Sequence, residues 1–266
     1  MIRVIVRYAR LYVIQAWFAY RALFAWSTPF NYFVSKFGFT FFSMVLFVFM
    51  GKFVGLDDPV YIVIGNILII PATNGVGGIS MTVGNERQFG ALSYLLGSPA
   101  PRAPIFLGRA LFHILDSFIT VAIALPVAIF IFHIDMLNTN FLLVLFCMLI
   151  TSFTTSGMGF IMGSVSLISR DGWMITSTLS LSLYILVGAN FPVSALPVFL
   201  QNISYSLPMT RGIMAARAAL SGADWDSISH LVFGEMWVGI IYIMVGYLMF
   251  RLLERQSMVS GSLDSL

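Results

Sequence analysis

Six stretches of this chain are long and apolar enough to cross a lipid bilayer as helices, and this feature limits the fold more than any other. A helix that spans the hydrocarbon core needs about 20 mostly apolar residues. The composition agrees, since 59% of the residues are hydrophobic and only 9% are charged. We therefore expect an all-α integral membrane protein with a single membrane domain over residues 1–266. The predicted spans are residues 30–54, 60–82, 105–132, 138–168, 173–190 and 231–250.

The basic residues predict how these six helices are oriented. Cytoplasmic loops of membrane proteins are enriched in Lys and Arg. With the N-terminus inside, all of the fourteen basic residues except Lys52, Arg211 and Arg217 fall on the cytoplasmic side. An even number of spans returns the C-terminus to the same side. We therefore expect a multi-pass protein of the inner (cytoplasmic) cell membrane with both termini in the cytoplasm.

The first 27 residues are predicted to form an amphipathic helix in the inner membrane interface, with Trp17 and Phe18 at headgroup depth. Two arginines interrupt the apolar region and no small-residue cleavage site follows, so a signal peptide is excluded. A simple juxtamembrane charge cluster is the alternative. At 100° per residue the arginines fall within one narrow arc: Arg3, Arg7, Arg10 and Arg21.

The sequence lacks the motifs of the common energy-converting and catalytic sites. The phosphate-binding pattern G-x-x-x-x-G-K-[ST] is absent, because the "GKF" at 51–53 lacks both the upstream glycine and the hydroxyl residue. Neither H-E-x-x-H nor G-x-S-x-G occurs. The lone Cys147 predicts a buried hydrophobe, and the scattered basic residues give no footprint for nucleic acid. We expect no catalytic residue, metal or cofactor on this chain.

Uncharged polar residues form one stripe in each of two predicted spans. Such a stripe lines a polar pathway, or it serves the commoner purpose of hydrogen bonding between helices. The stripe in the second span consists of Asn66, Thr73 and Asn74, and the stripe in the fifth consists of Ser177, Ser180 and Tyr184. In the fourth span, Gly159 and Gly163 form a G-x-x-x-G pair that predicts a close helix contact.

Ionisable residues inside predicted spans are few. His113 and Asp116 lie one turn apart in the third span, just before its longest apolar run. We expect them near the inner headgroups, where a charge is less costly than at the bilayer centre, in a structural role. A role in a transport path is the alternative. Glu235, at the outer end of the last span, is interpreted in the same way.

The interruption at residues 191–222 faces outside and predicts two short helices. Apolar residues recur at helical spacing in the first, Pro208 ends it, and a second helix runs from about Met209 until Gly222. Such helices are expected to dip into the outer leaflet or to cover the exit of a pathway.

The long cytoplasmic interruption, residues 84–102, contains "NERQFGALSYLLGSPAPR". Phe89, Leu92 and Leu96 form an apolar ridge at i, i+3 and i+7, which suits the groove of a partner protein. The opposite charges of Glu86 and Arg87 flank this ridge and are suited to fixing its register. An amphipathic surface helix without a partner is the alternative.

Two patterns together resemble the type-2 permeases of ATP-binding-cassette exporters, and the resemblance covers essentially the whole chain. The cytoplasmic pattern consists of Glu86, Arg87, Gly90, Leu92, Leu95, Leu96, Ser98 and Pro99. The outer pattern consists of Phe191, Pro192, Pro197, Leu207, Pro208 and Thr210. Full Leu-Leu-x-Ser-Pro signatures are typical of the branch that exports drugs, antibiotics and peptides. Where the family often has an acidic residue, this chain has Ser93.

The resemblance implies a division of labour among subunits. The cytoplasmic pattern would be the coupling helix that docks on a separate ATPase subunit, and the outer pattern would cap the exit. The complex would contain two such ATPase subunits, which hold the ATP and Mg²⁺. A second permease copy, identical or related, would complete a pathway for an amphipathic or lipid-like cargo. A glycan exporter of the same superfamily is one alternative, with Trp173 and Tyr184 as the rings to test. An ion-coupled carrier that needs no ATPase is another.

Overall fold

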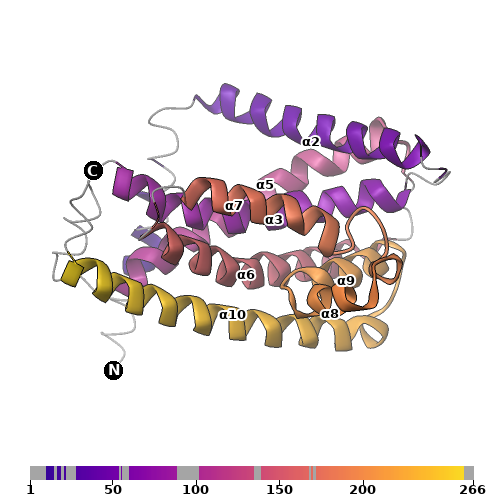
Figure 1. Ribbon diagram of the computed structural model, residues 1–266. Coiled ribbons are helices and arrows are strands. Elements are labelled where there is room, and N and C mark those ends of the chain that lie inside the picture. Colours follow the sequence, from indigo (N-terminus) through magenta and orange to yellow (C-terminus); the bar gives the residue numbers. More distant parts are fainter. Residues whose placement is uncertain are drawn as a thin grey trace.

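The computed structural model describes residues 10–14, 17–18, 21, 28–53, 55, 60–88, 102–134, 139–167, 169 and 172–260. Over these ranges the chain forms an elongated bundle of helices without strands (Figure 1). The long helices are α2 (Pro29–Phe53), α3 (Val60–Gln88), α5 (Arg102–Phe130), α6 (Phe141–Ser166) and α10 (Trp225–Ser260). The short elements are α7 (Gly172–Leu186), η1 (Val193–Ala195), α8 (Val198–Ser206) and α9 (Thr210–Leu220).

Five of the six expected spans are helices long and apolar enough to cross a membrane: Pro29–Phe53, Val60–Thr82, Phe112–Phe130, Phe141–Ser166 and Trp225–Gln256. The expectation of a sixth full-length span at 173–190 is corrected to a short one. Helix α7 has 15 residues, or about 22 Å, against about 30 Å of hydrocarbon. It ends because Gly188 adopts a left-handed φ of 75°, the usual way to terminate a helix.

Helices α3, α6 and α10 run in one direction, and α2, α5 and α7 run in the opposite one (Figure 1). The residue contacts confirm that α3 is antiparallel to both α5 and α7. In each case, residues later in α3 contact residues that come earlier in the other segment. The α3–α5 pairs are Thr82 with His113 and Asn74 with Thr120, and the α3–α7 side has Ser80 with Thr176 and Gly65 against Ala189. The end of α3 and the start of α5 therefore lie at the same end of the bundle.

Helices α3 and α6 form the centre of the bundle, with 78% and 61% of the residues in their most apolar stretches buried. Small residues let the backbones approach closely. A Cβ atom added at Gly159 would lie 2.8 Å from the carbonyl oxygen of Gly75, which confirms the predicted close helix contact at Gly159. On the other side of α6, a Cβ added at Gly157 would lie 2.6 Å from the backbone nitrogen of Ile243 in α10.

The two outer helices were predicted closely. Helix α8 ends at Ser206, Pro208 lies in the turn, and α9 ends just before Gly222, whose φ is 88°. Together α8 and α9 form a helical hairpin beside the first turns of α10 (Figure 1). Helix α10 itself starts six residues earlier than the span predicted at 231–250 and runs to Ser260. Its polar ends extend the helix beyond the apolar stretch that marks the span.

Candidate functional site

A groove of about 1120 Å³ opens between α2 and α7, with residues of α3 and of the segment after α7 completing its wall. Its lining is almost wholly apolar, and the polar groups that reach it are few, chiefly Ser43, Tyr184 and Asn190. Aromatic and aliphatic side chains supply the rest: Phe39, Phe42, Leu46, Phe47, Met50, Ile62, Leu181, Ile185 and Phe191. A hollow with this lining suits an amphipathic molecule, since a few placed polar groups in an apolar wall fix the orientation of a ligand.

An amide pair lies beside this groove and joins three helices. Asn66 is fully buried, and its side-chain amide donates to Asn190 Oδ1 over 2.9 Å and to the Ile62 carbonyl over 2.9 Å. The hydroxyl of Ser43 on α2 donates to Asn66 Oδ1 over 3.3 Å. Asn190 in turn donates to the Tyr184 carbonyl over 3.2 Å. These bonds satisfy polar groups that would otherwise be costly in an apolar interior.

Asn190 was missed as a site residue from the sequence, because it stands at the predicted end of the fifth span and belongs to neither stripe. The available signal was an amide two residues after Gly188, the glycine that ends an apolar helix. Phe47 and Tyr184 were brought together across the same groove, with their rings stacked at 5.7 Å between centroids and 9° between planes. Such a stacked pair adds to the contact between α2 and α7.

The other residues of the two predicted polar stripes do not gather at one site. The Thr73 hydroxyl donates to carbonyls of its own helix, at Ile69 and Ile70, while Asn74 turns toward α5. Ser177 and Ser180 are half-buried on α7. The side chain of Trp173 lies outside the described residues. The structure therefore places Tyr184 in the groove lining and Asn66 behind it, bonded to Ser43 and Asn190 of the lining. Asn74 belongs to a different cluster.

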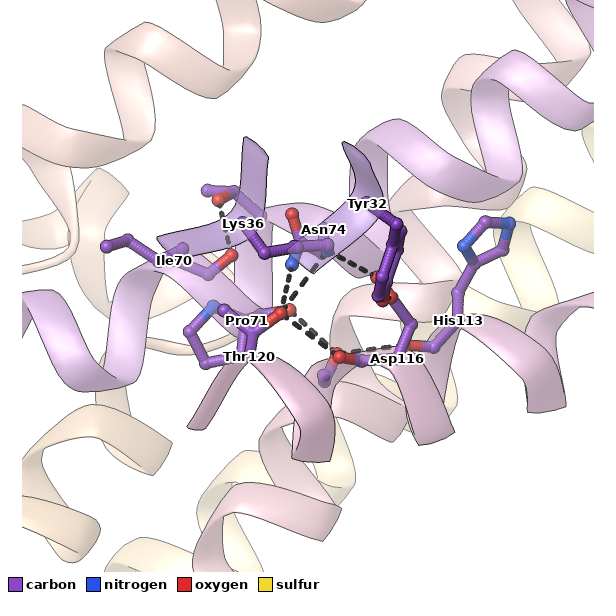
Figure 2. A network of polar contacts seen from close by, with 10 residues as sticks. Tyr32, Lys36, Ile70, Pro71, Asn74, His113, Asp116 and Thr120 are labelled. Carbon is purple, nitrogen blue, oxygen red and sulfur yellow. Dashed lines mark hydrogen bonds and ion pairs between the residues drawn. The ribbon is translucent and has the colours of Figure 1, made fainter. Parts of the chain in front are cut away.

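A second polar group, the charged cluster, consists of Tyr32, Lys36, Asn74, Asp116 and Thr120 (Figure 2). Lys36 Nζ lies 2.7 Å from Asp116 Oδ2 and 3.3 Å from Thr120 Oγ1, and the Tyr32 hydroxyl donates to Asp116 Oδ1. Asn74 donates to Thr120 Oγ1 over 3.0 Å. The cluster thus connects α2 to α5 and α3, and Asp116 within it is only 6% exposed.

His113 and Asp116, predicted as neighbours on one face, have different partners. The His113 Nε2 atom lies 3.3 Å from the Thr82 hydroxyl on α3, and its ring occupies the space above Gly78, where a Cβ would lie 2.1 Å from Nδ1. Sequence reasoning assigned Lys36 to the cytoplasmic cations and did not pair it with Asp116. The only sequence signal was that Lys36, like Asp116, interrupts an apolar span near the same membrane face.

The outer hairpin is fixed at its turn by a carboxylate from α10. Glu235 is fully buried; its Oε1 accepts from Met209 N and Thr154 Oγ1, each over 2.6 Å, and its Oε2 accepts from Gly212 N over 3.0 Å. The first N–H groups of α9 have no partner within their own helix and carry partial positive charge. A carboxylate is therefore a strong cap here, which agrees with the predicted structural role of Glu235.

Arg217 fastens α9 to the end of α7. Its guanidinium carbon lies 3.5 Å from the centroid of the Tyr61 ring, and it donates to the carbonyls of Gly188, Ala189 and Tyr61 over 3.1, 2.8 and 3.2 Å. Carbonyls at a helix C-terminus attract cations. Burial lowers the pKa of Arg217 from its ordinary value by removing water from the charge, though an arginine remains protonated. This packing explains how Arg217 is accommodated on the side of the membrane that the sequence predicts to be outside.

The predicted outer-gate residues lie along the hairpin and its approach. Phe191 is half-buried and lines the groove, Pro192 and Pro197 are exposed ahead of η1 and α8, and Leu207 and Pro208 are buried in the turn. The gate pattern therefore extends from the groove to the Glu235 cap. A gate function for these residues stays a prediction.

Most of the predicted coupling segment falls outside the described residues. Glu86 and Arg87 belong to the last turn of α3, without described side chains. The remaining coupling residues lie wholly outside: Phe89, Gly90, Leu92, Leu95, Leu96, Ser98 and Pro99. The interfacial helix over residues 1–27 is described only in part, with Arg10–Ile14 helical and Trp17 and Phe18 exposed. Both predictions stay predictions.

A bundle whose described residues include five helices long and apolar enough to cross a membrane defines the class of multi-pass integral membrane proteins. Residues 12–221 match the family model described as ABC-2 type transporter. Since this match covers most of the chain, the protein belongs to that family, and the resemblance to type-2 permeases is confirmed. Permeases of this family are not themselves catalytic and act with ATPase subunits.

Two curated relatives are similar to the chain. They carry the same description, "Probable multidrug ABC transporter permease YbhR", and come from Escherichia coli strain K12 and Escherichia coli O157:H7. Each is 26% identical over 201 residues, which cover 73% of this chain and 53% of the relative. The chain thus spans about half the length of the curated relatives it matches.

Proposed function

We propose that this chain is the membrane subunit of an ATP-driven exporter and that amphipathic compounds pass along the groove between α2 and α7. The observation that carries the proposal is the groove itself, with about 1120 Å³ of apolar-lined space and a few polar groups at its wall. Typical binding sites for drug-sized molecules hold about 300–1,000 Å³. The word "multidrug" in the relatives' description points in the same direction.

The proposed assembly contains two permease copies, identical or related, and two ATPase subunits that hold ATP and Mg²⁺. The ATPases would dock on residues 84–102, because this segment joins α3 to α5 at one end of the bundle. In this arrangement α7 is the fifth of six crossings: with the residues that follow it, α7 runs antiparallel to α3 from the level of Ser80 to the level of Gly65. Six crossings place both termini on the same side of the membrane, and the distribution of basic residues assigns that side to the cytoplasm.

Two observations favour an amphipathic cargo over the alternatives. In a glycan exporter an exposed ring would stack on sugars, but Tyr184 already stacks on Phe47. An ion-coupled carrier would keep an intramembrane acid available to its ion, but both carboxylate oxygens of Asp116 are occupied by Lys36 and Tyr32. A polar cargo also has few partners in a groove lined almost entirely by apolar side chains.

The test is transport in reconstituted vesicles. The chain is combined with its ATPase subunit, and uptake of a fluorescent amphipathic dye into inside-out vesicles is followed with ATP, without ATP, and with a proton gradient alone. ATP-dependent uptake that needs both subunits supports the proposal. Uptake by this chain alone on a proton gradient would contradict it and establish the ion-coupled carrier.

The docking segment is tested separately by co-purification. Glu86→Ala combined with Arg87→Ala should leave the chain inserted and folded but weaken recovery of the ATPase, since both flanking charges of the ridge are removed. A matched control is Arg251→Ala with Arg255→Ala, which removes two exposed charges near the end of α10. Equal recovery with both double variants would show that docking does not use Glu86 and Arg87.

A further inference from the structure

We infer that Lys36 and Asp116 form an ionic latch that holds α2 against α5 and thereby fixes the width of the groove between α2 and α7. The inference rests on the proposed function, because the groove is the proposed cargo route. It assigns positioning roles to two residues outside the groove lining.

Apolar packing holds α2 only weakly. In its most apolar stretch 17% of the residues are buried, against 78% in α3. The buried residues of α2 form a narrow stripe, Thr40, Met44, Val48 and Gly51. Most of its phenylalanines are exposed. A single stripe defines a line of contact with the bundle and leaves rotation about that line free.

Hollows lie on both sides of α2. The groove toward α7 holds about 1120 Å³, and a second hollow of about 330 Å³ separates α2 from α5, lined by Phe33 and Phe37 on one side and by residues such as Pro126 and Phe130 on the other. Beside these hollows, the Phe47–Tyr184 stack and the Ser43–Asn66 hydrogen bond are the contacts that hold the middle of α2. The polar contacts near the start of the helix add the charged ones.

Those contacts converge on one carboxylate (Figure 2). Lys36 binds Asp116 Oδ2 at 2.7 Å, and Tyr32, one turn earlier, donates to Asp116 Oδ1. Both oxygens are thus held by α2. Buried ion pairs contribute little to net stability, and their best-attested role is to fix register or to act in a switch. Charged residues inside membrane segments are rare and mark functional positions.

The latch also lies between the proposed energy input and the groove. Helix α5 begins at Arg102, directly after the segment proposed to dock the ATPase, and Asp116 lies about 21 Å along it at 1.5 Å per residue. On α2, Phe39 and Phe42 of the groove follow Lys36 within two turns. A displacement of α5 is therefore passed to α2, and with it to the groove wall, through the contacts of Lys36 and Tyr32 with Asp116.

The experiment measures the distance between α2 and α7 by pulsed electron spin resonance, with spin labels at Phe42→Cys and Leu181→Cys. These positions face each other across the groove and are 68% and 69% exposed. The buried Cys147 is replaced by alanine so that only the two introduced cysteines react. The full chain is measured in lipid nanodiscs, with and without its ATPase, so the readout needs neither cargo nor turnover.

Five variants separate the latch from a general loss of packing. Lys36→Met and Asp116→Asn should broaden the distance distribution, and the exchange Lys36→Asp with Asp116→Lys should restore a narrow one. Lys52→Met is the matched control, since it removes an exposed cation from the other end of α2. Tyr32→Phe removes one of the two α2 contacts without leaving a charge unpaired, so it yields a result even where Lys36→Met fails to insert.

The outcomes are distinct. Broadening in the single variants that the exchange reverses supports the latch. An unchanged distribution in Asp116→Asn and Tyr32→Phe overturns it, whatever transport does, and shows that the apolar stripe alone places α2. A widened groove with unchanged dye transport keeps the latch but overturns the groove as cargo route, which is a failure of the proposed function.

Discussion

Helices α2 and α10 are equally peripheral, but they are attached to the bundle in different ways. In each, 17% of the residues in the most apolar stretch are buried. Helix α10 lies so close to α6 that glycine is needed at Gly157, Gly239 and Gly246, whereas α2 has an apolar stripe, one ion pair and a hollow on each side. The same degree of burial thus accompanies a closely packed helix on one side and a loosely packed one on the other.

This difference assigns separate tasks to the two sides of the molecule. Close backbone contact with interhelical hydrogen bonds stabilises helix pairs in lipid, where no hydrophobic force drives association. The side built from α6, α9 and α10 therefore serves as the frame. The side built from α2 and α7 has open space and few specific contacts, which suits a part that changes position during transport.

The largest effect is expected from Glu235→Ala in the frame. The change leaves two backbone N–H groups of the α9 turn without their acceptor, while the Thr154 hydroxyl keeps the Thr151 carbonyl as acceptor. Since each buried unsatisfied group costs about 1–3 kcal/mol, we expect a loss of about 3 kcal/mol or more, seen as a lower melting temperature in detergent. Glu235→Gln keeps one acceptor oxygen and should lose less. A wild-type melting temperature for Glu235→Ala would show that the cap does not stabilise the frame.

The next largest effect comes from adding one methyl group at the α6–α10 contact. In Gly157→Ala the new Cβ meets backbone atoms of Tyr242 and Ile243 at 2.8 and 2.6 Å, so we expect destabilisation by about 1–3 kcal/mol. Gly38→Ala in α2 is the matched control: nothing lies within 4 Å of its Cβ, and alanine should raise stability by up to about 1 kcal/mol. Equal melting temperatures for the two variants would remove the contrast between α10 and α2.

A smaller effect is expected at the amide pair beside the groove. A double-mutant cycle with Asn66→Leu and Asn190→Leu should give a coupling energy of about 1 kcal/mol, the usual size for a hydrogen bond between membrane helices. Thermal unfolding of the four proteins provides the measurement. A coupling near zero would mean that Asn190 contributes to the groove wall without fastening α7 to α3.

The smallest effect on stability is expected from filling the groove. Leu46→Trp places a larger ring in open space, so the free energy of unfolding should change by no more than about 0.5 kcal/mol, while ATP-driven dye transport falls. Leu248→Trp, on the exposed face of α10, is the control, since Leu46 and Leu248 are 56% and 59% exposed. Loss of transport in both variants would show that a tryptophan in the groove impairs transport no more than one on the exposed face of α10.

Local signals in the sequence predicted much of the fold. The lengths of the apolar runs identify the long helices, and Pro208 and Gly222 mark the hairpin because each acts on the backbone of its own neighbours. Helix α7 was predicted too long for a related reason. A single glycine, Gly188, hardly lowers the hydropathy of the run around it, yet its left-handed φ ends the helix.

The partners of polar residues were predicted less well, because they depend on which helices become neighbours. Lys36 and Asp116 are 80 residues apart, and nothing near either one specifies the other. Arg217 was counted as a charge that breaks the orientation rule, whereas it binds carbonyls at the end of α7. Hydropathy and charge counts consider each residue separately. They therefore identify Asn66 and Asp116 as unusual within apolar helices, but they do not indicate which residue either one binds.

The conformation of Met209 has a consequence for how the protein is made. Its φ of 80° is a left-handed value that side chains with a Cβ rarely adopt, and its N–H is held by a carboxylate 26 residues further along. The ribosome delivers Met209 to the membrane before Glu235 exists. We therefore expect the hairpin turn to reach its final form only after α10 has been inserted, so that a helix synthesised later completes the fold of the turn before it.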